Sequence, residues 1–253
     1  MVALLIATAA TSPTAAARQG GGGTIASAPT VTPGTQEFGN TADGKYQYYG
    51  QDYGADFWKL SLIAADHVTV DWESTYDSGC GCWYVDRFLV WPKGTTDYSI
   101  NNVDPFQKFY GGGNGKAESS FTANATGAFP IMFVSVDENG GTGPYDFTVR
   151  VRHLPRIKMQ QLPTRVSSGM SAKVTAYFAD GKPISGAKPV IRVRGQWQGA
   201  WHSLGSGTPT NGLATIKLVI PSSARGMAVK FQATASGGAY VSVKTPTQTR
   251  TVG

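Results

Sequence analysis

Hydrophobic and polar positions alternate along most of this chain with a period of two, which is the pattern of β-strands with one buried face. The clearest case is the stretch 143–153. It places four apolar residues on one face and polar residues on the other, the apolar ones being Tyr145, Phe147, Val149 and Val151. Proline cannot donate to a strand ladder, and Pro155 follows at once. We therefore expect a domain to end beside it.

The first half of the chain repeats this pattern in shorter pieces. Residues 56–63 and 67–72 alternate on either side of a polar turn, which predicts a β-hairpin or a sandwich corner. Further strands are expected at 87–91, 120–123 and 129–136, with Gly and Asn clusters between them. Short strands at this spacing predict a β-sandwich over residues 34–153.

The second half is patterned in the same way. Strands are expected at 157–162, 171–179, 190–193, 214–220, 228–235 and 241–245. No long segment after the first residues has the 3.6-residue spacing of an amphipathic helix. The fold class predicted is therefore all-β, with two β-sandwich domains in tandem that cover residues 34–153 and 154–253.

Four segments of the first domain carry a family resemblance: 56–70, 86–94, 126–134 and 143–149. Together they resemble the bacterial pre-peptidase C-terminal domain, a jelly-roll-like sandwich appended to secreted peptidases, over most of residues 50–152. The resemblance implies a substrate-binding or secretion-associated accessory role. The paired aspartates of that family are reduced here to Asp86, and we expect no metal and no cofactor.

Segments of the second domain resemble the bacterial Ig-like domains of secreted actinobacterial proteins, over nearly its whole length. They are residues 180–195, 201–205, 210–218 and 229–233. The resemblance implies a Greek-key sandwich that serves as a spacer or adhesion module and has no active site.

The start of the chain has the features of a secretory signal peptide. Residues 1–17 combine a short apolar core, a proline and small residues at Ala15 and Ala17, although no positively charged segment precedes the core. Residues 18–33 contain the run Gly20–Gly23 and predict a flexible linker. No later apolar run is long enough to span a membrane. We expect a secreted, extracellular protein that is a monomer.

Cysteine is rare, and the two residues present are Cys80 and Cys82. His67, His153 and His202 have no ligand spacing relative to them or to one another, so no metal site is predicted. In an oxidising compartment we expect a Cys80–Cys82 disulfide, which would be tight and strained. A redox role and an intermolecular bridge are the alternatives.

Aromatic residues gather in the segment 45–53. Flat amphipathic rings are what a sugar-binding or peptide-binding face needs, so a ligand-binding role is a candidate for Tyr46, Tyr48, Tyr49 and Tyr53. The alternative is that these tyrosines are half-buried strand residues, since strands are enriched in tyrosine.

Charge divides the chain into opposite halves. Residues 24–153 hold 8 Lys or Arg against 15 Asp or Glu, and residues 154–253 hold 13 against 1, giving net charges of −7 and +12. A field of the second kind attracts polyanions such as wall teichoic acids, acidic polysaccharides or nucleic acid. The candidate contacts are Arg192, Arg194, Lys173 and Lys217. The alternatives are solubility and docking of the basic domain on the acidic one.

Motifs for catalysis are missing from the sequence. The three histidines are scattered, and there is no nucleophile elbow or zinc-protease motif. We therefore predict a secreted, non-catalytic binding, adhesion or accessory protein that acts on a polysaccharide, a wall polymer or a protein. A carbohydrate-binding module that uses the tyrosine face is the second hypothesis. An extracellular hydrolase with paired carboxylates is the third.

Overall fold

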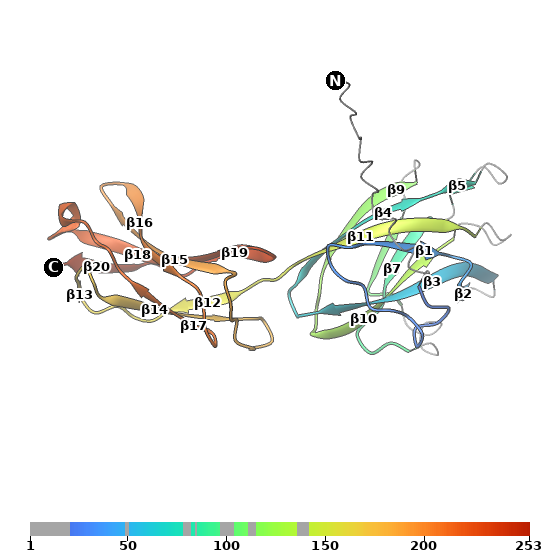
Figure 1. Ribbon diagram of the computed structural model, residues 1–253, viewed down its shortest axis with the longest axis horizontal. Helices are drawn as coiled ribbons and strands as arrows, with labels where there is room; N and C mark the ends of the chain where they lie inside the picture. Colours follow the sequence, from blue (N-terminus) through green and yellow to red (C-terminus); the bar gives the residue numbers. More distant parts are fainter. Residues whose placement is uncertain are drawn as a thin grey trace, which may run out of the picture.

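A computed structural model describes residues 21–48, 51–77, 82–83, 85–96, 104–110, 115–135 and 142–253. Figure 1 shows two β domains placed end to end and joined by a short linker. The regular structure of the described residues consists of strands and one 3-10 turn, η1 (Ser222–Ala224), so the all-β prediction is confirmed. The predicted signal peptide 1–17 lies outside the described residues.

The first domain packs two antiparallel sheets face to face. One sheet has the order β1 (Gln36–Asn40), β11 (Pro144–Arg152), β4 (His67–Ser74), β9 (Lys116–Thr122). The other has the order β2 (Gly44–Tyr48), β3 (Gln51–Leu62), β10 (Gly127–Val134), β7 (Arg87–Val90), β8 (Gln107–Tyr110), and a separate pair joins β5 (Tyr76–Asp77) to β6 (Cys82–Trp83). Apart from the added edge strand β2, this is the strand order of a jelly roll.

The turn between β3 and β4 is a sandwich corner, because the two strands belong to different sheets. Of the two predicted possibilities, the hairpin is therefore excluded. The Asp66 carboxylate, which is buried, stabilises the corner by accepting a hydrogen bond from the Ile63 N–H at 2.8 Å. The chain can thus pass from one sheet to the other within a few residues.

The segment predicted to be a flexible linker packs against the first domain instead, from residue 21 onward. Strand β10 is apolar on both faces, since Phe129–Val134 is a continuous buried run, and its outer face needs a cover. Ile25 and Ala28 join Phe57 and Met132 in that outer cluster. The sequence predicts a flexible linker here because residues 20–23 are all glycine. The apolar residues that follow them are too widely spaced to indicate a packed segment.

A buried carboxylate ties the parts of the first domain together. Asp56 Oδ2 accepts hydrogen bonds from the backbone N–H of Gly21 and Asn40 at 3.0 and 3.1 Å. It also accepts hydrogen bonds from the Tyr145 hydroxyl at 2.7 Å and the Trp58 indole at 3.3 Å. Burial raises the pKa of Asp56 to about 6, although these donors favour the charged form.

The second domain has the strand order of an immunoglobulin-like sandwich. Its smaller sheet has the order β12 (Arg156–Met159), β14 (Ser171–Tyr177), β17 (Leu213–Lys217). Its larger sheet has the order β13 (Arg165–Val166), β20 (Gln248–Val252), β18 (Ala228–Gly237), β15 (Val190–Trp197), β16 (Ala200–Gly207), and β19 (Tyr240–Lys244) also pairs with β18. In immunoglobulin terms these are strands A-B-E packed on A′-G-F-C-C′.

Strict alternation builds the core of this domain. Val174, Ile191, Val193 and Phe231 are fully buried between the two sheets, and the residues next to them in sequence face outward. Strand β16 was not predicted, because Ser and Gly interrupt its alternation. It returns from β15 through a two-residue turn, in which Gln198 and Gly199 both have positive φ, as a type I′ hairpin requires.

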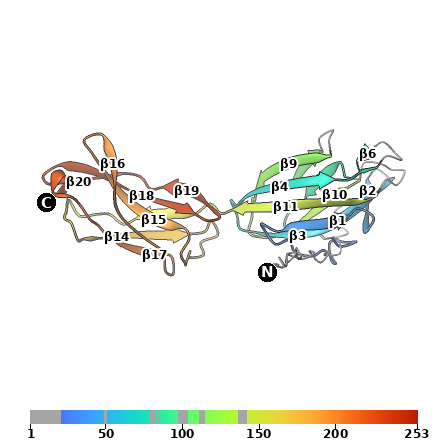
Figure 2. The same cartoon turned by 45° about the horizontal axis from the view of Figure 1, so that its top comes forward.

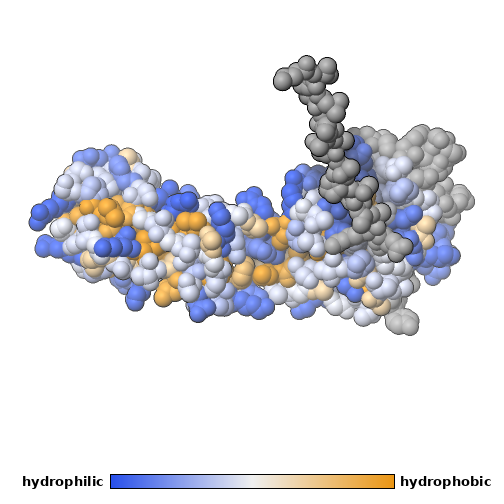
Figure 3. All heavy atoms as spheres, viewed as in Figure 1, coloured by the Kyte–Doolittle hydropathy of each residue, from blue (hydrophilic) through white to orange (hydrophobic). Residues whose placement is uncertain are grey.

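The linker is held on both sides by one residue. His153 Nδ1 lies 2.8 Å from Asp66 Oδ1 of the first domain. The backbone of His153 bonds to Ala239 and Val241 at 2.7 and 2.8 Å, and its ring packs against Phe178 and Tyr240 of the second domain. Figure 3 shows the result as one elongated body, with hydrophobic residues gathered along the second domain and around the junction.

Candidate functional site

The tyrosine cluster lies on β2 and β3 and is not one exposed face. Tyr46 is 5% exposed and packs edge-on against the buried Trp91, with the ring centroids 6.0 Å apart. Its ring is therefore a core ring, as the alternative to ligand stacking proposed. Tyr53 is half-buried, and its hydroxyl donates to Gln51 at 3.0 Å. Tyr49 and the side chain of Tyr48 lie outside the described part of the chain.

A pocket of about 220 Å³ opens beside this cluster, on the outer face of the larger sheet of the first domain. It is lined by Tyr46, Arg87, Leu89, Lys108 and Tyr110. Tyr110 is 69% exposed. The Arg87 guanidinium lies 5.9 Å from the centre of its ring and 5.8 Å from that of Tyr53. A cation between two aromatic rings suits a ligand with a ring and an anionic group.

Asp86, the residue before Arg87 in the sequence, is a partly buried carboxylate beside this pocket. The Asp86 carboxylate lies 3.2 Å from Arg87 Nε. Burial raises the pKa of Asp86, and the Arg87 charge opposes that rise. The sequence did not indicate this pocket, because its residues come from β2, β7 and β8, which lie far apart along the chain.

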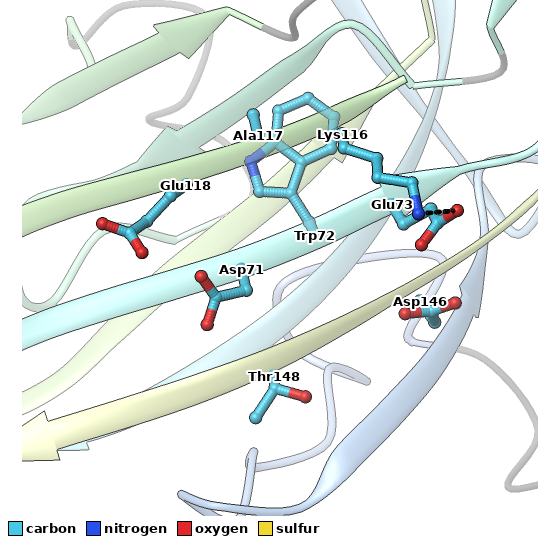
Figure 4. A pocket seen from close by; sticks show the side chains of 8 residues that line it. All are labelled: Asp71, Trp72, Glu73, Lys116, Ala117, Glu118, Asp146 and Thr148. Carbon is cyan, nitrogen blue, oxygen red and sulfur yellow. Dashed lines mark ion pairs between the residues drawn. The ribbon is translucent and has the colours of Figure 1, made fainter. Parts of the chain in front are cut away.

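The opposite sheet of the first domain carries a groove of about 370 Å³ on its outer face. Figure 4 shows its side chains projecting from neighbouring strands, with Lys116 paired to Glu73 at 2.7 Å. Arg150 bonds to both Asp71 and Glu118, at 2.9 and 3.3 Å. These pairs neutralise much of the groove's charge. The groove therefore offers hydrogen-bond acceptors rather than a strong negative field.

The second domain presents two cationic surfaces, one on each sheet. On the larger sheet, outward positions carry four cations that we name the arginine face: Arg192, Arg194, Lys230 and Lys244. On the smaller sheet, outward positions carry four more that we name the lysine face: Arg156, Lys158, Lys173 and Lys217. The four cations predicted from the sequence are therefore divided between opposite sides of the sandwich.

Hydrogen bonds and an aromatic ring fix the arginine face. Arg192 Nη1 donates to Ser236 Oγ at 3.1 Å, and Arg194 Nη2 donates to Gln232 Oε1 at 2.9 Å. The Arg194 guanidinium also lies over the Trp201 ring, 4.7 Å from its centre, and Trp201 is 36% exposed. Stacking of this kind orients the guanidinium and leaves N–H groups for a ligand. Trp201 was missed in the sequence because strand β16 was missed.

The lysine face is arranged as a diagonal row. In register, Lys158 lies opposite Thr175, Lys173 opposite Thr215 and Lys217 opposite Ser171. Like charges directly opposite would repel, whereas diagonal neighbours are about 7–8 Å apart. The row thus places one ammonium group on each of the three strands. Tyr177 and Leu213, which are 36% and 39% exposed, lie on the same face.

Carboxylates do not neutralise either face. Asp180 is the one acidic residue after position 153, and it pairs with Lys182 at 3.5 Å in the turn after β14. In the part of the chain that the structure describes, no ion pair joins the eight cations to the first domain. The domains are held end to end at His153, so the predicted alternative of charge-driven docking between them is absent from this arrangement.

The histidines lie far apart in the fold and do not converge. His67 contacts Thr122 at 3.2 Å, His153 contacts Asp66, and His202 stacks on Trp197 with centroids 3.9 Å apart. Among the described residues, no group of three or more His, Cys, Asp or Glu side chains is placed to hold a metal ion. Cys80 and the side chain of Cys82 lie outside those residues, so the disulfide stays a prediction.

No helix among the described residues is both long and apolar enough to cross a membrane. Carboxylates lie near one another in the groove of Figure 4, where two of the three ion-paired ones share Arg150. This arrangement holds the carboxylates to the sheet and does not resemble an acid and a nucleophile with separate environments.

Comparisons with known proteins give fold-level likeness alone. No family model matches the sequence, and no curated protein matches it significantly. The adhesin domain of Epf from Streptococcus pyogenes is similar at 11% identity and a TM-score of 0.40, covering 86% of this chain and 77% of that one. The amphioxus IgVJ-C2 molecule is similar at 11% identity and a TM-score of 0.21, covering 88% of this chain and 99% of that one. Likeness at this level identifies no family for the chain, and the fold rests on its own strand order.

Proposed function

We propose that this is a secreted, non-catalytic binding protein that attaches to anionic extracellular polymers through its second domain. The observation that carries the proposal is the pair of outer faces described above, with four cations each and no carboxylate within either. Neutralised phosphates or carboxylates release their counterions, so such faces gain affinity from any polyanion of sufficient length. The first domain then acts as the accessory module held at the polymer.

The Ig-like strand order supports a role without catalysis. It supplies outward-facing sheets in the second domain, where Asp180 is the single acidic residue. Flat cationic sheets suit extended polymers, whose charges repeat along a line, better than small compact anions.

A test uses the full-length protein, a short DNA duplex and purified teichoic acid at two salt concentrations. Affinity should fall steeply with salt, at a slope of about −0.9 per phosphate contact for the duplex. The variant Lys173→Glu with Lys217→Glu, and the variant Arg192→Glu with Arg194→Glu, should each weaken binding to both polymers. Lys188→Glu with Arg225→Glu is the matched control, because both residues are exposed in loops off the two faces. Salt-independent binding, or equal losses in all three variants, would contradict the proposal.

A second candidate concerns the first domain and rests on the exposed Tyr110 ring beside Arg87. This pocket suits an acidic saccharide, which would stack on the ring and pair with the guanidinium. In a background that carries Lys173→Glu, Lys217→Glu, Arg192→Glu and Arg194→Glu, which weakens binding by the second domain, Tyr110→Ala should then remove the remaining retention on an acidic polysaccharide while the first domain stays folded. Retention that is unchanged in Tyr110→Ala would exclude the pocket.

A further inference from the structure

We propose that the second domain binds two polyanion strands at once, one on each face, and so cross-links anionic polymers. This inference rests on the proposed polyanion binding and adds the number of polymer strands that one domain binds. It is motivated by the division of the cations between two surfaces that no single straight strand can touch.

The two faces are separated by the hydrophobic core. The inward residues of β14 and of β15, such as Val174 and Val193, are fully buried between the sheets. Packed sheets lie about 10 Å apart, and the outward side chains add to that thickness. A polymer strand on the lysine face is therefore separated from one on the arginine face by the full thickness of the sandwich.

Each face is sufficient to hold a strand by itself. On the lysine face, the two diagonal steps from Lys158 through Lys173 to Lys217 span about 15 Å, which is enough for several charges of a linear polymer. These side chains form no ion pair among the described residues, so their charges are available. Arg156 extends the cationic surface along β12.

The arginine face holds its cations differently. Lys244 lies opposite Thr234, and Thr234 lies opposite Arg192, so two cations share one row across three strands. In the next row Arg194 lies opposite Gln232, which fixes its guanidinium. Planar guanidinium groups bind phosphate with two hydrogen bonds, whereas ammonium groups act as point charges. The two faces should therefore differ in preference as well as in position.

The first domain leaves both faces open. Its contacts with the second domain are made at the end of the sandwich, where His153 meets Phe178, Ala239 and Tyr240. Figure 2 shows the two domains meeting end to end. Two strands can thus approach from opposite sides.

A stiff probe separates cross-linking from wrapping. A flexible polymer could bend around the edge of the domain and occupy both faces by itself. Duplex DNA has a persistence length of about 50 nm, far longer than a domain, so a short duplex touches one face only. Capture of two duplexes by one protein molecule then reports two separate faces.

The experiment uses the full-length protein with one short duplex in two forms, biotinylated and fluorescent. Immobilised biotinylated duplex is incubated with protein and then with fluorescent duplex at low salt. We expect fluorescent duplex to be retained, and retention to fall again at excess protein, because each duplex is then saturated separately.

Matched variants disable one face each. Lys158→Glu, Lys173→Glu and Lys217→Glu together remove the lysine face, and Arg192→Glu, Arg194→Glu and Lys230→Glu together remove the arginine face, with equal changes in charge. Each variant should still bind the immobilised duplex through its remaining face, with a salt slope of about −0.9 per phosphate contact that this face makes. Each should retain less than about a tenth of the fluorescent duplex that the unmodified protein retains. Circular dichroism and thermal melting show whether each variant is folded.

The outcomes distinguish the two proposals. Absence of any duplex binding by the unmodified protein overturns the proposed function and this inference with it. Binding of the first duplex without retention of the second overturns cross-linking alone. Retention by both single-face variants also overturns it, because bridging would then come from protein dimers, which carry two copies of the remaining face.

Discussion

The two domains handle polar and charged groups in opposite ways. The first domain buries Glu37, Asp56 and Asp66 together with several hydroxyl side chains, whereas Thr245 is the one buried polar residue described in the second. The acidic count of the first domain therefore overstates its surface field. All the cations of the second domain lie outside its core, so its charge of +12 acts fully on the surroundings. The net charge of a domain therefore predicts its surface electrostatic field only when it is known which charged residues are buried.

The same contrast extends to the strands. In the first domain β10 is buried on both faces and is covered by the segment 21–31, whereas β14 and β18 of the second domain alternate between core and solvent. A sheet with two covered faces can place polar groups between its layers. A sheet with one open face places them in water, where they can meet a partner.

The largest expected effects test whether the domains have independent cores. Phe147→Ala and Phe231→Ala each remove a fully buried ring, one per domain, and should cost about 3–5 kcal/mol of unfolding free energy. Each should lower the melting temperature of its own domain in calorimetry and leave the other transition in place. A single shared transition that moves in both variants would show that the junction couples the two cores.

Asp56 should make the stability of the first domain depend on pH. Its folded-state pKa of about 6 lies above the value of 3.8 expected in the unfolded chain, so the folded state binds the proton more tightly. The resulting stability is fully present below about pH 3.8 and is lost as pH rises through 6, by up to about 3 kcal/mol.

Denaturant unfolding measures this pH-dependent stability. It is carried out on Asp56→Asn and on the unmodified protein from pH 4 to pH 7. The difference in unfolding free energy between the two proteins should change over this window, in favour of the unmodified protein at the acidic end. A constant difference would mean that Asp56 keeps an ordinary pKa.

The cover of the first domain should contribute a smaller amount. Ile25→Ala removes part of a side chain that is 5% exposed and should destabilise this domain by about 2 kcal/mol. A flexible linker, as the sequence predicts, would give no change. Thr30→Ala, at an exposed position of the same segment, serves as the control in the same melting experiment.

The smallest effect is expected on the charged faces. Lys173→Glu with Lys217→Glu should change the unfolding free energy of the second domain by less than about 0.5 kcal/mol, because both side chains are exposed and unpaired. Relief of repulsion among like charges favours a slight gain. A loss of several kcal/mol would show that these lysines hold the fold together, which would remove the contrast between the domains.

Alternation allowed the strands to be predicted wherever one face is buried. The stretch 143–153 matches β11, and 171–179 matches β14, because a period of two is visible without knowledge of any partner. Strand β16 was not predicted, since its side chains are mostly exposed. The covering segment at residues 21–31 was also missed, because the apolar outer face that it covers is formed mainly by β3 and β10, which come later in the chain.

The candidate surfaces could be predicted only in part. Arg192 and Arg194 share a strand, so their common face follows from spacing alone. That Lys173 and Lys217 lie on the opposite side depends on which strands share a sheet, and this is a property of the topology. The pocket beside Arg87 likewise combines residues from strands that are distant in sequence.

The contacts of His153 determine how the molecule tumbles in solution. With its ring and its backbone both engaged, the linker of residues 153–155 transmits rotation from one domain to the other. If the second domain attaches to a polymer as proposed, these contacts would fix the direction in which the first domain projects from it. A protein of this kind would set a constant angle and standoff between the polymer and whatever the first domain meets.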